Sequence, residues 1–121
     1  MNWQNLGNIQ SVEFTCGHCG FVVASDRGYY CNDDPHACVY ICPHCKRPSY
    51  LDYNVQIPGV APGNDVQFLP DDVAALYREA RNSVAAAAYT ASVLTCRKLL
   101  MSIAVSQGAV PGKRFIEYVE Y

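Results

Sequence analysis

The sequence predicts an α+β chain in which a small β-rich unit precedes an α-helical hairpin. Six of the seven cysteines lie within residues 16–45, among short β-branched and aromatic runs that are typical of strands. Residues 58–70 are rich in proline and glycine, and beyond residue 70 apolar side chains recur at helical spacing. We therefore expect a β unit in residues 1–57, a linker in residues 58–70, and in residues 71–121 a helical hairpin with the start of a third helix.

The composition limits the class of protein. The 121 residues are 50% hydrophobic and 17% charged, which suits one domain or two very small units rather than a disordered chain. A net charge of −2 does not favour binding to nucleic acid or an anionic membrane by charge alone. No apolar run approaches the roughly 20 residues of a membrane span, and no secretory signal is recognisable. We expect a cytoplasmic protein without a membrane partner.

Four of the cysteines form two matched pairs, Cys16-x-x-Cys19 and Cys42-x-x-Cys45, with 22 residues between the pairs. Apolar runs at residues 12–14, 21–23, 39–41 and 50–53 flank the pairs, so each pair is expected at the end of a strand. Two such pairs suit a tetrahedral zinc ion, because each turn brings two sulfurs to one metal. The arrangement is that of a zinc ribbon. The polar residues 25–37 between the pairs are expected to form a loop.

The zinc site is expected to be structural, with one ion per chain. Four thiolates close the coordination sphere and leave no position for water or substrate. A unit of 57 residues has little core, and zinc ligation worth about 10–16 kcal/mol replaces it. A redox function of the thioredoxin type is the alternative. It is not favoured, because no βαβ pattern surrounds either pair.

The other thiols and histidines of the β unit are harder to interpret. Cys31, His36 and Cys38 either form a second metal site or remain buried or free thiols, since their spacing is irregular and no fourth ligand is evident. His18 and His44 lie inside the cysteine pairs and are expected to point into solvent.

The second half of the chain predicts two antiparallel helices. Pro70 followed by Asp71 and Asp72 marks a helix start, where negative charge is favourable. The four alanines at 85–88 allow either one long helix or a tight joint between two helices, and we favour the joint. Residues 113–121 are expected to begin a third helix through Phe115, Ile116 and Val119. Cys96 is expected to be a small buried hydrophobe. The two apolar series are Val73, Leu76, Tyr77, Ala80 and Val84, then Val93, Cys96, Leu99, Leu100, Ile103 and Ala104.

Three motifs carry a family resemblance: Leu69-Pro70-Asp71-Asp72-Val73, Tyr77-Arg78-Glu79-Ala80-Arg81 and Arg97-Lys98-Leu99-Leu100. Residues 14–105 resemble a bacterial family of unknown function that is often linked to restriction endonuclease subunits and allied to the HEPN helical superfamily. The resemblance implies a zinc ribbon in front of a HEPN-like helical domain.

The chain departs from that family at two positions. No acidic residue follows the leucine after Arg97, and no histidine follows His44, whereas HEPN ribonucleases use an arginine with a nearby histidine. The resemblance therefore implies a relative that lacks the catalytic histidine. Arg97 either faces a partner or groove, or is a solvated residue that reaches Glu79 across the hairpin.

We expect a non-catalytic zinc-binding interaction or accessory module. The family resemblance implies that it belongs to a bacterial nucleic-acid-processing or defence system. A two-helix hairpin cannot bury a broad apolar face alone, so a homodimer or a protein partner is expected at the helices. Leu76, Tyr77, Arg97 and Leu100 are the candidate interaction residues.

Two alternatives remain open. Direct nucleic-acid binding by the ribbon would use Lys46, Arg47 and Tyr50, but residues 1–57 contain three basic and five acidic side chains. Enzymatic activity is not favoured, because no nucleophile–base or phosphate-binding motif is evident. Asp33 and Asp34 near His36 are the nearest catalytic candidates, and they are expected to form a loop turn instead.

Overall fold

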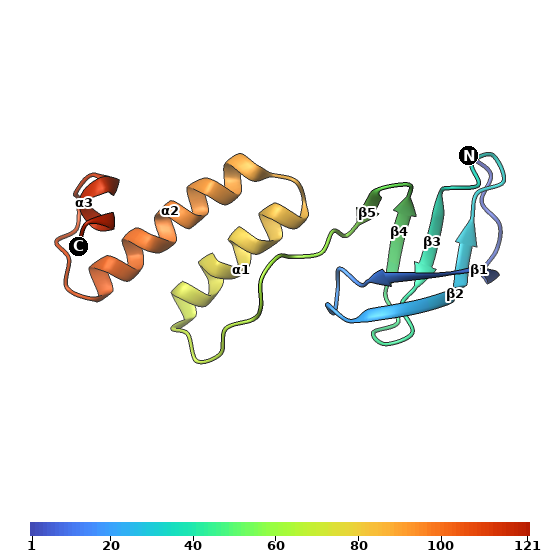
Figure 1. The fold of residues 1–121 in the computed structure, drawn as a ribbon, viewed down its shortest axis with the longest axis horizontal. Helices are drawn as coiled ribbons and strands as arrows, with labels where there is room; N and C mark the ends of the chain where they lie inside the picture. Colours follow the sequence, from blue (N-terminus) through green and yellow to red (C-terminus); the bar gives the residue numbers. More distant parts are fainter. The chain divides into compact units, whose positions relative to one another are not determined.

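The computed structural model describes residues 1–121 and divides into two compact units. The β unit comprises Met1–Ala61 and the helical unit Pro62–Tyr121 (Figure 1). A five-stranded antiparallel sheet followed by helices confirms the α+β class. None of the helices has the length and hydropathy needed to cross a membrane.

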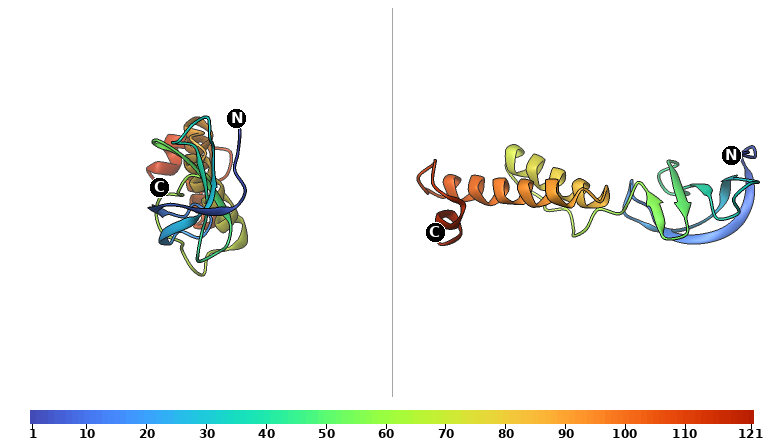
Figure 2. Two further views of the ribbon diagram at one scale, coloured as in Figure 1. Left: turned by 90° about the vertical axis from the view of Figure 1, so that its right-hand side faces the viewer. Right: turned by 90° about the horizontal axis from the view of Figure 1, so that it is seen from above.

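The sheet of the β unit is a meander in which each strand pairs with the next along the chain. Its strands are β1 (Gly7–Thr15), β2 (Val22–Tyr30), β3 (Cys38–Ile41), β4 (Pro48–Asp52) and β5 (Val55–Ile57). The β1–β2 hairpin is long and strongly curved (Figure 2), and the register of β1 shifts between Asn8 and Val12.

The predicted loop over residues 25–37 is wrong in its first part, because β2 continues to Tyr30. Two features hold these polar residues in the sheet. Ser25 Oγ donates to Ile41 O at 2.7 Å, and Gly28 passes so close to β3 that a Cβ atom there would lie 2.0 Å from Val39 O. Residues 25–30 therefore form a strand despite a composition typical of turns, and their polar side chains are mostly exposed.

The core of the β unit lies directly beside the cysteine pairs. Phe14 and Tyr40 pack with their ring centroids 6.0 Å apart, next to the fully buried Cys16 and Cys42. Tyr40 Oη donates to Gln10 O, which lies in the irregular stretch of β1. Partly buried residues complete this cluster: Ile9, Val12, Cys19, Val23, Cys38, Cys45 and Leu51.

The helical unit contains α1 (Asp71–Ala85), α2 (Tyr89–Ser106) and the short α3 (Phe115–Val119). The predicted pair of helices with a tight joint is confirmed, and α1 and α2 lie antiparallel (Figure 1). The joint is a Schellman motif: Ala88 N–H donates to Ser83 O, and Ala87 N–H to Val84 O. Ala87 takes a positive φ of 56°, so the good helix propensity of alanine is overridden here.

The contact between α1 and α2 is made by small side chains. Ser92 Oγ donates to Ala80 O at 3.1 Å, and Thr95 is buried one turn further along α2. The expectation that Cys96 is buried is wrong, since its side chain is exposed. Because α2 turns Ser92 and Thr95 to α1, most of its apolar series is exposed, and only Leu99 and Ala104 are half-buried or buried.

Arg81 attaches the start of the helical unit to α1. Its Nε donates to Pro62 O at 2.7 Å, and its guanidinium forms an ion pair with Asp65. The apolar side chains of the predicted linker do not provide this anchoring, because Val66 and Phe68 are exposed.

The third helix buries a different residue from those predicted. Tyr118 is 6% exposed, whereas Ile116 and Val119 are more than half exposed. The Tyr118 hydroxyl accepts a hydrogen bond from Lys113 N–H and donates to Val110 O, which fixes the turn before α3.

Candidate metal centre

The two cysteine pairs fold into turns with the same backbone hydrogen bonds. In the first turn, Cys16 N–H donates to Phe21 O at 2.9 Å, and Gly20 N–H donates to Cys16 O at 2.8 Å. The second turn repeats both bonds, at 3.0 and 2.9 Å, from the backbone N–H groups of Cys42 and Lys46. Each strand that enters a turn is therefore paired with the strand that leaves it, which positions the cysteines at the strand ends.

The four sulfurs converge on one point. All four Sγ atoms lie within 4.8 Å of one another, with Cys16 Sγ 3.8 Å from Cys45 Sγ and Cys19 Sγ 3.9 Å from Cys42 Sγ. A tetrahedral ion with metal–sulfur bonds of about 2.3 Å requires sulfur–sulfur separations of about 3.8 Å. Both the donor set and its dimensions fit a zinc site.

Burial and hydrogen bonding shift the pKa values of two of the thiols in opposite directions. Burial raises the pKa of Cys16, but backbone hydrogen bonds from Cys19 and His18, with the neighbouring thiols, outweigh it and lower that pKa to about 6. For Cys19, a backbone hydrogen bond from Phe21 lowers the pKa, while burial and the surrounding thiols raise it to about 11. The cluster thus favours the thiolate of Cys16 and disfavours a second thiolate at Cys19. A cation bound among the sulfurs removes that opposition.

Each turn needs one residue with a left-handed backbone. Gly20 fills this position in the first turn with φ 75°, and Lys46 fills it in the second with φ 63°. Lys46 Nζ also donates to Pro43 O at 2.6 Å. This conformation directs backbone N–H groups toward the sulfurs, as in the 3.5 Å contact from Cys45 N to Cys42 Sγ.

The two histidines inside the pairs are exposed, as expected, but each contacts the opposite turn. His18 Nε2 donates to Pro48 O at 2.9 Å, and the His44 ring stacks on Phe21 with centroids 4.0 Å apart. Neither contact was expected from the sequence. The signal was the repeated histidine at the same position of both pairs.

A segment far along the chain closes over the first turn. Gln56 Nε2 donates to Thr15 O at 2.7 Å, and a Cβ atom on Gly17 would lie 2.2 Å from Pro58 O. Pro43 occupies the corresponding position of the second turn, which has no such cover to accommodate. Nothing in the sequence pattern indicated this role for Gln56.

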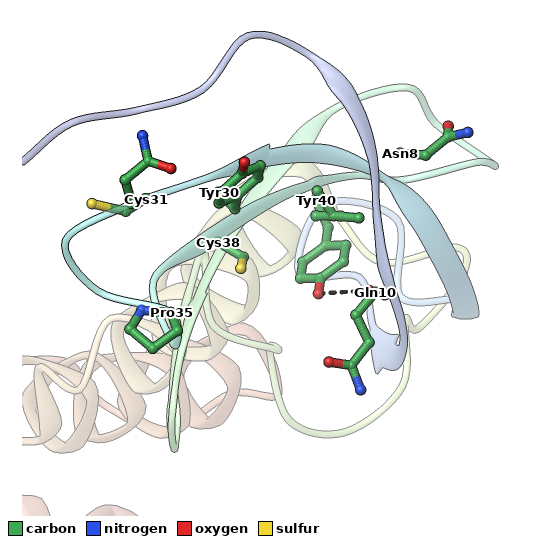
Figure 3. A pocket seen from close by; sticks show the side chains of 9 residues that line it. Asn8, Gln10, Tyr30, Cys31, Pro35, Cys38 and Tyr40 are labelled. Atoms are coloured by element: carbon green, nitrogen blue, oxygen red, sulfur yellow. Dashed lines mark hydrogen bonds between the residues drawn. The ribbon is translucent and has the colours of Figure 1, made fainter.

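The other two cysteines of the β unit, Cys31 and Cys38, lie at a separate cavity of about 390 Å³, also lined by Tyr40 (Figure 3). Cys31 is buried and Cys38 half-buried, and burial raises the pKa of the Cys38 thiol. Their sulfurs point in different directions (Figure 3), and the His36 ring stacks instead on Tyr53 at 3.9 Å. Cys31, His36 and Cys38 therefore do not form a group of metal ligands. The one such group in the structure consists of the four paired cysteines.

The predicted nucleic-acid residues are not all in one place. Lys46 and Arg47 are exposed at the second turn. Tyr50 is half-buried on β4, where its hydroxyl donates to Asp52 and its ring packs edge-on against Trp3. Only the two basic residues are therefore available at the cysteine turns.

The acidic pair considered as a catalytic candidate forms turn contacts. Asp34 Oδ1 accepts the backbone N–H of His36 at 3.0 Å, as expected for a loop turn. Asp33 Oδ2 accepts the N–H of Asn2 at 2.7 Å and lies 3.6 Å from the terminal ammonium of Met1. Both carboxylates thus order the surrounding chain.

The predicted interaction residues of the helices are also divided. Tyr77 and Leu100 line an apolar groove of about 450 Å³, whereas Leu76 and Arg97 do not. Arg97 does not reach Glu79: its guanidinium lies 4.7 Å from the centroid of the Phe115 ring.

Comparisons with protein-family models, curated proteins and solved structures find no match to this chain.

Proposed function

We propose that this chain is a non-catalytic, zinc-binding interaction module. The single observation that carries the proposal is the convergence of four cysteine sulfurs, all within 4.8 Å of one another, in the β unit. Four protein thiolates fill the coordination sphere of zinc, so the ion serves to fold the unit. The position of Cys16 and Cys42 in the core supports this role, because the metal then joins the strand ends to the packed aromatic residues.

The helical unit provides the interaction surface. Its buried residues are mainly small, while large apolar side chains are exposed on α2 and around α3. Exposed apolar surface of this kind is typical of a binding site for another protein chain. The partner is a second copy of this chain or another protein.

The family resemblance suggests that the module serves a bacterial nucleic-acid-processing or defence system. A ribonuclease of the HEPN type is not supported, since residues 62–121 contain no histidine. The stacking of Arg97 on Phe115 gives that arginine a structural contact instead.

The metal site is tested by cobalt substitution. The protein refolded with Co²⁺ is expected to show the intense visible absorption of a tetrahedral tetrathiolate complex. Cys45→Ser should change this spectrum, while Cys96→Ser, which alters an exposed thiol outside the cluster, should leave it unchanged. A weak spectrum of octahedral type in the unsubstituted protein would reject the proposed centre.

Direct nucleic-acid binding by the β unit is a second candidate, favoured by one observation. The stacked pair of Phe21 and His44 is exposed beside Lys46 and Arg47, which places an aromatic surface next to positive charge. An exposed ring of this kind is suited to stacking on the bases of a single strand.

This second function predicts binding of single-stranded RNA or DNA that weakens steeply with salt. The double variant Lys46→Glu/Arg47→Glu should lose it. Arg27→Glu, which changes an exposed charge on β2 of the same unit, is the control. Equal binding by all three proteins, or no binding at low salt, would exclude this candidate.

A further inference from the structure

One face of α2 carries a continuous exposed apolar stripe, here called the α2 stripe. It consists of Tyr89, Val93, Cys96, Leu100 and Ile103, whose successive spacings are four, three, four and three residues. Tyr89 is 64% exposed, Val93 59%, Leu100 51% and Ile103 38%, and the Cys96 thiol is exposed as well. No element of the helical unit covers this stripe.

Helix α2 buries polar side chains against α1 and exposes larger apolar ones. The side chains that it buries against α1 include Ser92 and Thr95, and their hydroxyls form hydrogen bonds with the backbone oxygens of Ala80 and Ala91. A helix that packs only within its own unit turns its most apolar face inward. Apart from Leu99, which is half-buried beside α1, the larger apolar residues of this face of α2 are therefore directed at a surface outside the unit.

The spacing of the stripe indicates a helical partner. Alternating steps of three and four residues give a mean of 3.5, which is the repeat of helices that pack along a common seam. At about 100° per residue, the five positions fall within an arc of about 80°. This is a narrow seam over two heptads rather than a broad amphipathic face.

An apolar groove lies beside the stripe and complements it. The groove has a volume of about 450 Å³, and Cys96 and Leu100 form one of its walls. Ala80 and Val84 of α1 contribute to the lining. A ridge of exposed side chains next to an apolar groove is the arrangement that lets two copies interlock.

The stripe is also close to symmetric about its centre. Tyr89 and Ile103 are each seven residues from Cys96, and Val93 and Leu100 are three and four residues from it. A two-fold axis through Cys96 therefore brings apolar residues opposite apolar residues along the whole seam. Such self-complementarity is what an interface between identical chains requires.

Charge and area are compatible with a second copy. The stripe contains no charged residue, and the neighbouring Arg97 is held over Phe115. The stripe and the adjacent groove together lie on the face formed by α1 and α2, two helices about 25 Å long and about 10 Å apart, which is on the order of 500 Å² in projection. A specific interface takes roughly 800 Å² from each partner, so the contact uses the groove as well as the stripe.

We propose that the α2 stripe pairs with the α2 stripe of a second copy, about a two-fold axis that passes beside Cys96. The inference rests on the interaction role in the proposed function, and names its partner and surface. It places the two Cys96 thiols opposite each other whether the paired helices run parallel or antiparallel.

The first test compares two leucines of α2 with similar exposure. Leu100, 51% exposed, lies on the stripe, and Leu94, 58% exposed, lies off it. By light scattering, the unsubstituted protein and Leu94→Glu should have twice the chain mass of 13.4 kDa, and Leu100→Glu the single mass, with unchanged helicity. A monomeric unsubstituted protein, or a dimer that survives Leu100→Glu, would overturn the proposal.

The second test uses oxidative cross-linking. Copper–phenanthroline with oxygen accepts two electrons and two protons from a pair of facing thiols, and one disulfide forms. The zinc-loaded protein should give a covalent dimer that Cys96→Ser abolishes. Leu94→Cys in the Cys96→Ser background should not restore it. A Leu94→Cys dimer with no Cys96 dimer would place the interface on another face.

A third pair of variants, made in the Cys96→Ser background, assigns the helix direction. Val93→Cys should link to itself if the helices are parallel, and to Leu100→Cys of another copy if they are antiparallel. A zinc-loaded dimer that yields none of these links rejects the α2 seam and leaves the proposed module intact. A chain that binds no zinc rejects the proposed function, whatever its oligomeric state.

Discussion

The β unit and the helical unit have nearly equal length but bury different kinds of residue. The β unit packs two aromatic rings against buried cysteines, and Cys16 and Cys42 are fully enclosed. The helical unit buries mainly small residues such as Ala80 and Ala104, and leaves most of its large apolar side chains at the surface. Units of about 60 residues have little core of their own. The comparison shows two answers to this shortage: ligands for a metal in one unit, and a surface for another chain in the other.

The largest expected effect comes from removing two metal ligands. In Cys16→Ser/Cys42→Ser the β unit should lose its zinc and unfold, because zinc ligation contributes about 10–16 kcal/mol in small zinc domains. The helical unit should keep its helices. The fluorescence of Trp3, the single tryptophan, reports the β unit, and far-ultraviolet circular dichroism reports the helices. Equal loss of both signals would show that the two units do not differ in this way.

As the pH falls, the β unit should lose its zinc and its structure before the helical unit unfolds. Metal-bound thiolates have lower pKa values than free thiols, so their stabilisation is present above the free-thiol pKa and lost as the pH falls. Even without metal, the lowered pKa of Cys16, about 6, gives a stabilisation that is lost as the pH falls through about 6, whereas the raised pKa of Cys19, about 11, opposes stability only at alkaline pH. Zinc release, followed with a chelating dye, should therefore begin below about pH 6, while α1 and α2 persist. Helix loss before zinc release would contradict this order.

A matched pair of glycines tests the close approach of β2 to β3. Gly7 and Gly28 are register partners on β1 and β2. A Cβ atom on Gly28 would lie 2.0 Å from Val39 O, whereas on Gly7 the nearest atom is 3.8 Å away. Gly28→Ala should lower the free energy of unfolding of the β unit by about 2–3 kcal/mol, and Gly7→Ala should change it little. Equal effects in denaturant titrations of Trp3 fluorescence would reject the close approach.

Arg81 provides a smaller test in the helical unit. Arg81→Ala removes hydrogen bonds to Pro62 O and Gly63 O together with the ion pair to Asp65. The expected loss is about 1–2 kcal/mol of unfolding free energy in thermal or urea melts of the helical signal. Arg78→Ala, an exposed position on the same helix, should cost less than half as much. If Arg78→Ala is the more damaging change, the anchoring of residues 62–65 is not what stabilises this unit.

The smallest effect is expected at the helix joint, and it is stabilising. Ala87 has a positive φ of 56°, which glycine adopts more readily than alanine. Ala87→Gly should raise the melting stability of the helical unit by about 0.5–1 kcal/mol. Ala85→Gly, inside the last turn of α1, should instead lower it by about 0.5–1 kcal/mol. Destabilisation by both glycines would mean that the joint is not the Schellman turn described.

The metal centre was predictable from sequence because its geometry is local. Two residues between cysteines fix each turn, and the flanking apolar runs fix the strands that bring the turns together. The covering segment around Gln56 was not predictable, because its contact with Thr15 joins residues 41 positions apart and leaves no periodic pattern. The extension of β2 was missed because Gly28, read as a loop residue, is required by the close approach of Val39.

For the helices, the sequence predicts the elements but not which of their faces is buried. Their existence and the joint between them follow from spacing and from the residues near position 70. The orientation of α2 does not, because hydrophobic periodicity identifies an apolar face without identifying what covers it. Cys96 was expected inside on that ground, yet the face buried against α1 belongs to Ser92 and Thr95. The prediction failed where a polar helix face packs within the unit.

Native mass spectrometry of the protein purified without added metal tests the account most directly, because it reports metal content and oligomeric state together. We predict a dimer of the 13.4 kDa chain with one zinc ion in each copy. A metal-free monomer would contradict both answers to the shortage of core, since it would remove the zinc from the β unit and the partner from the helices.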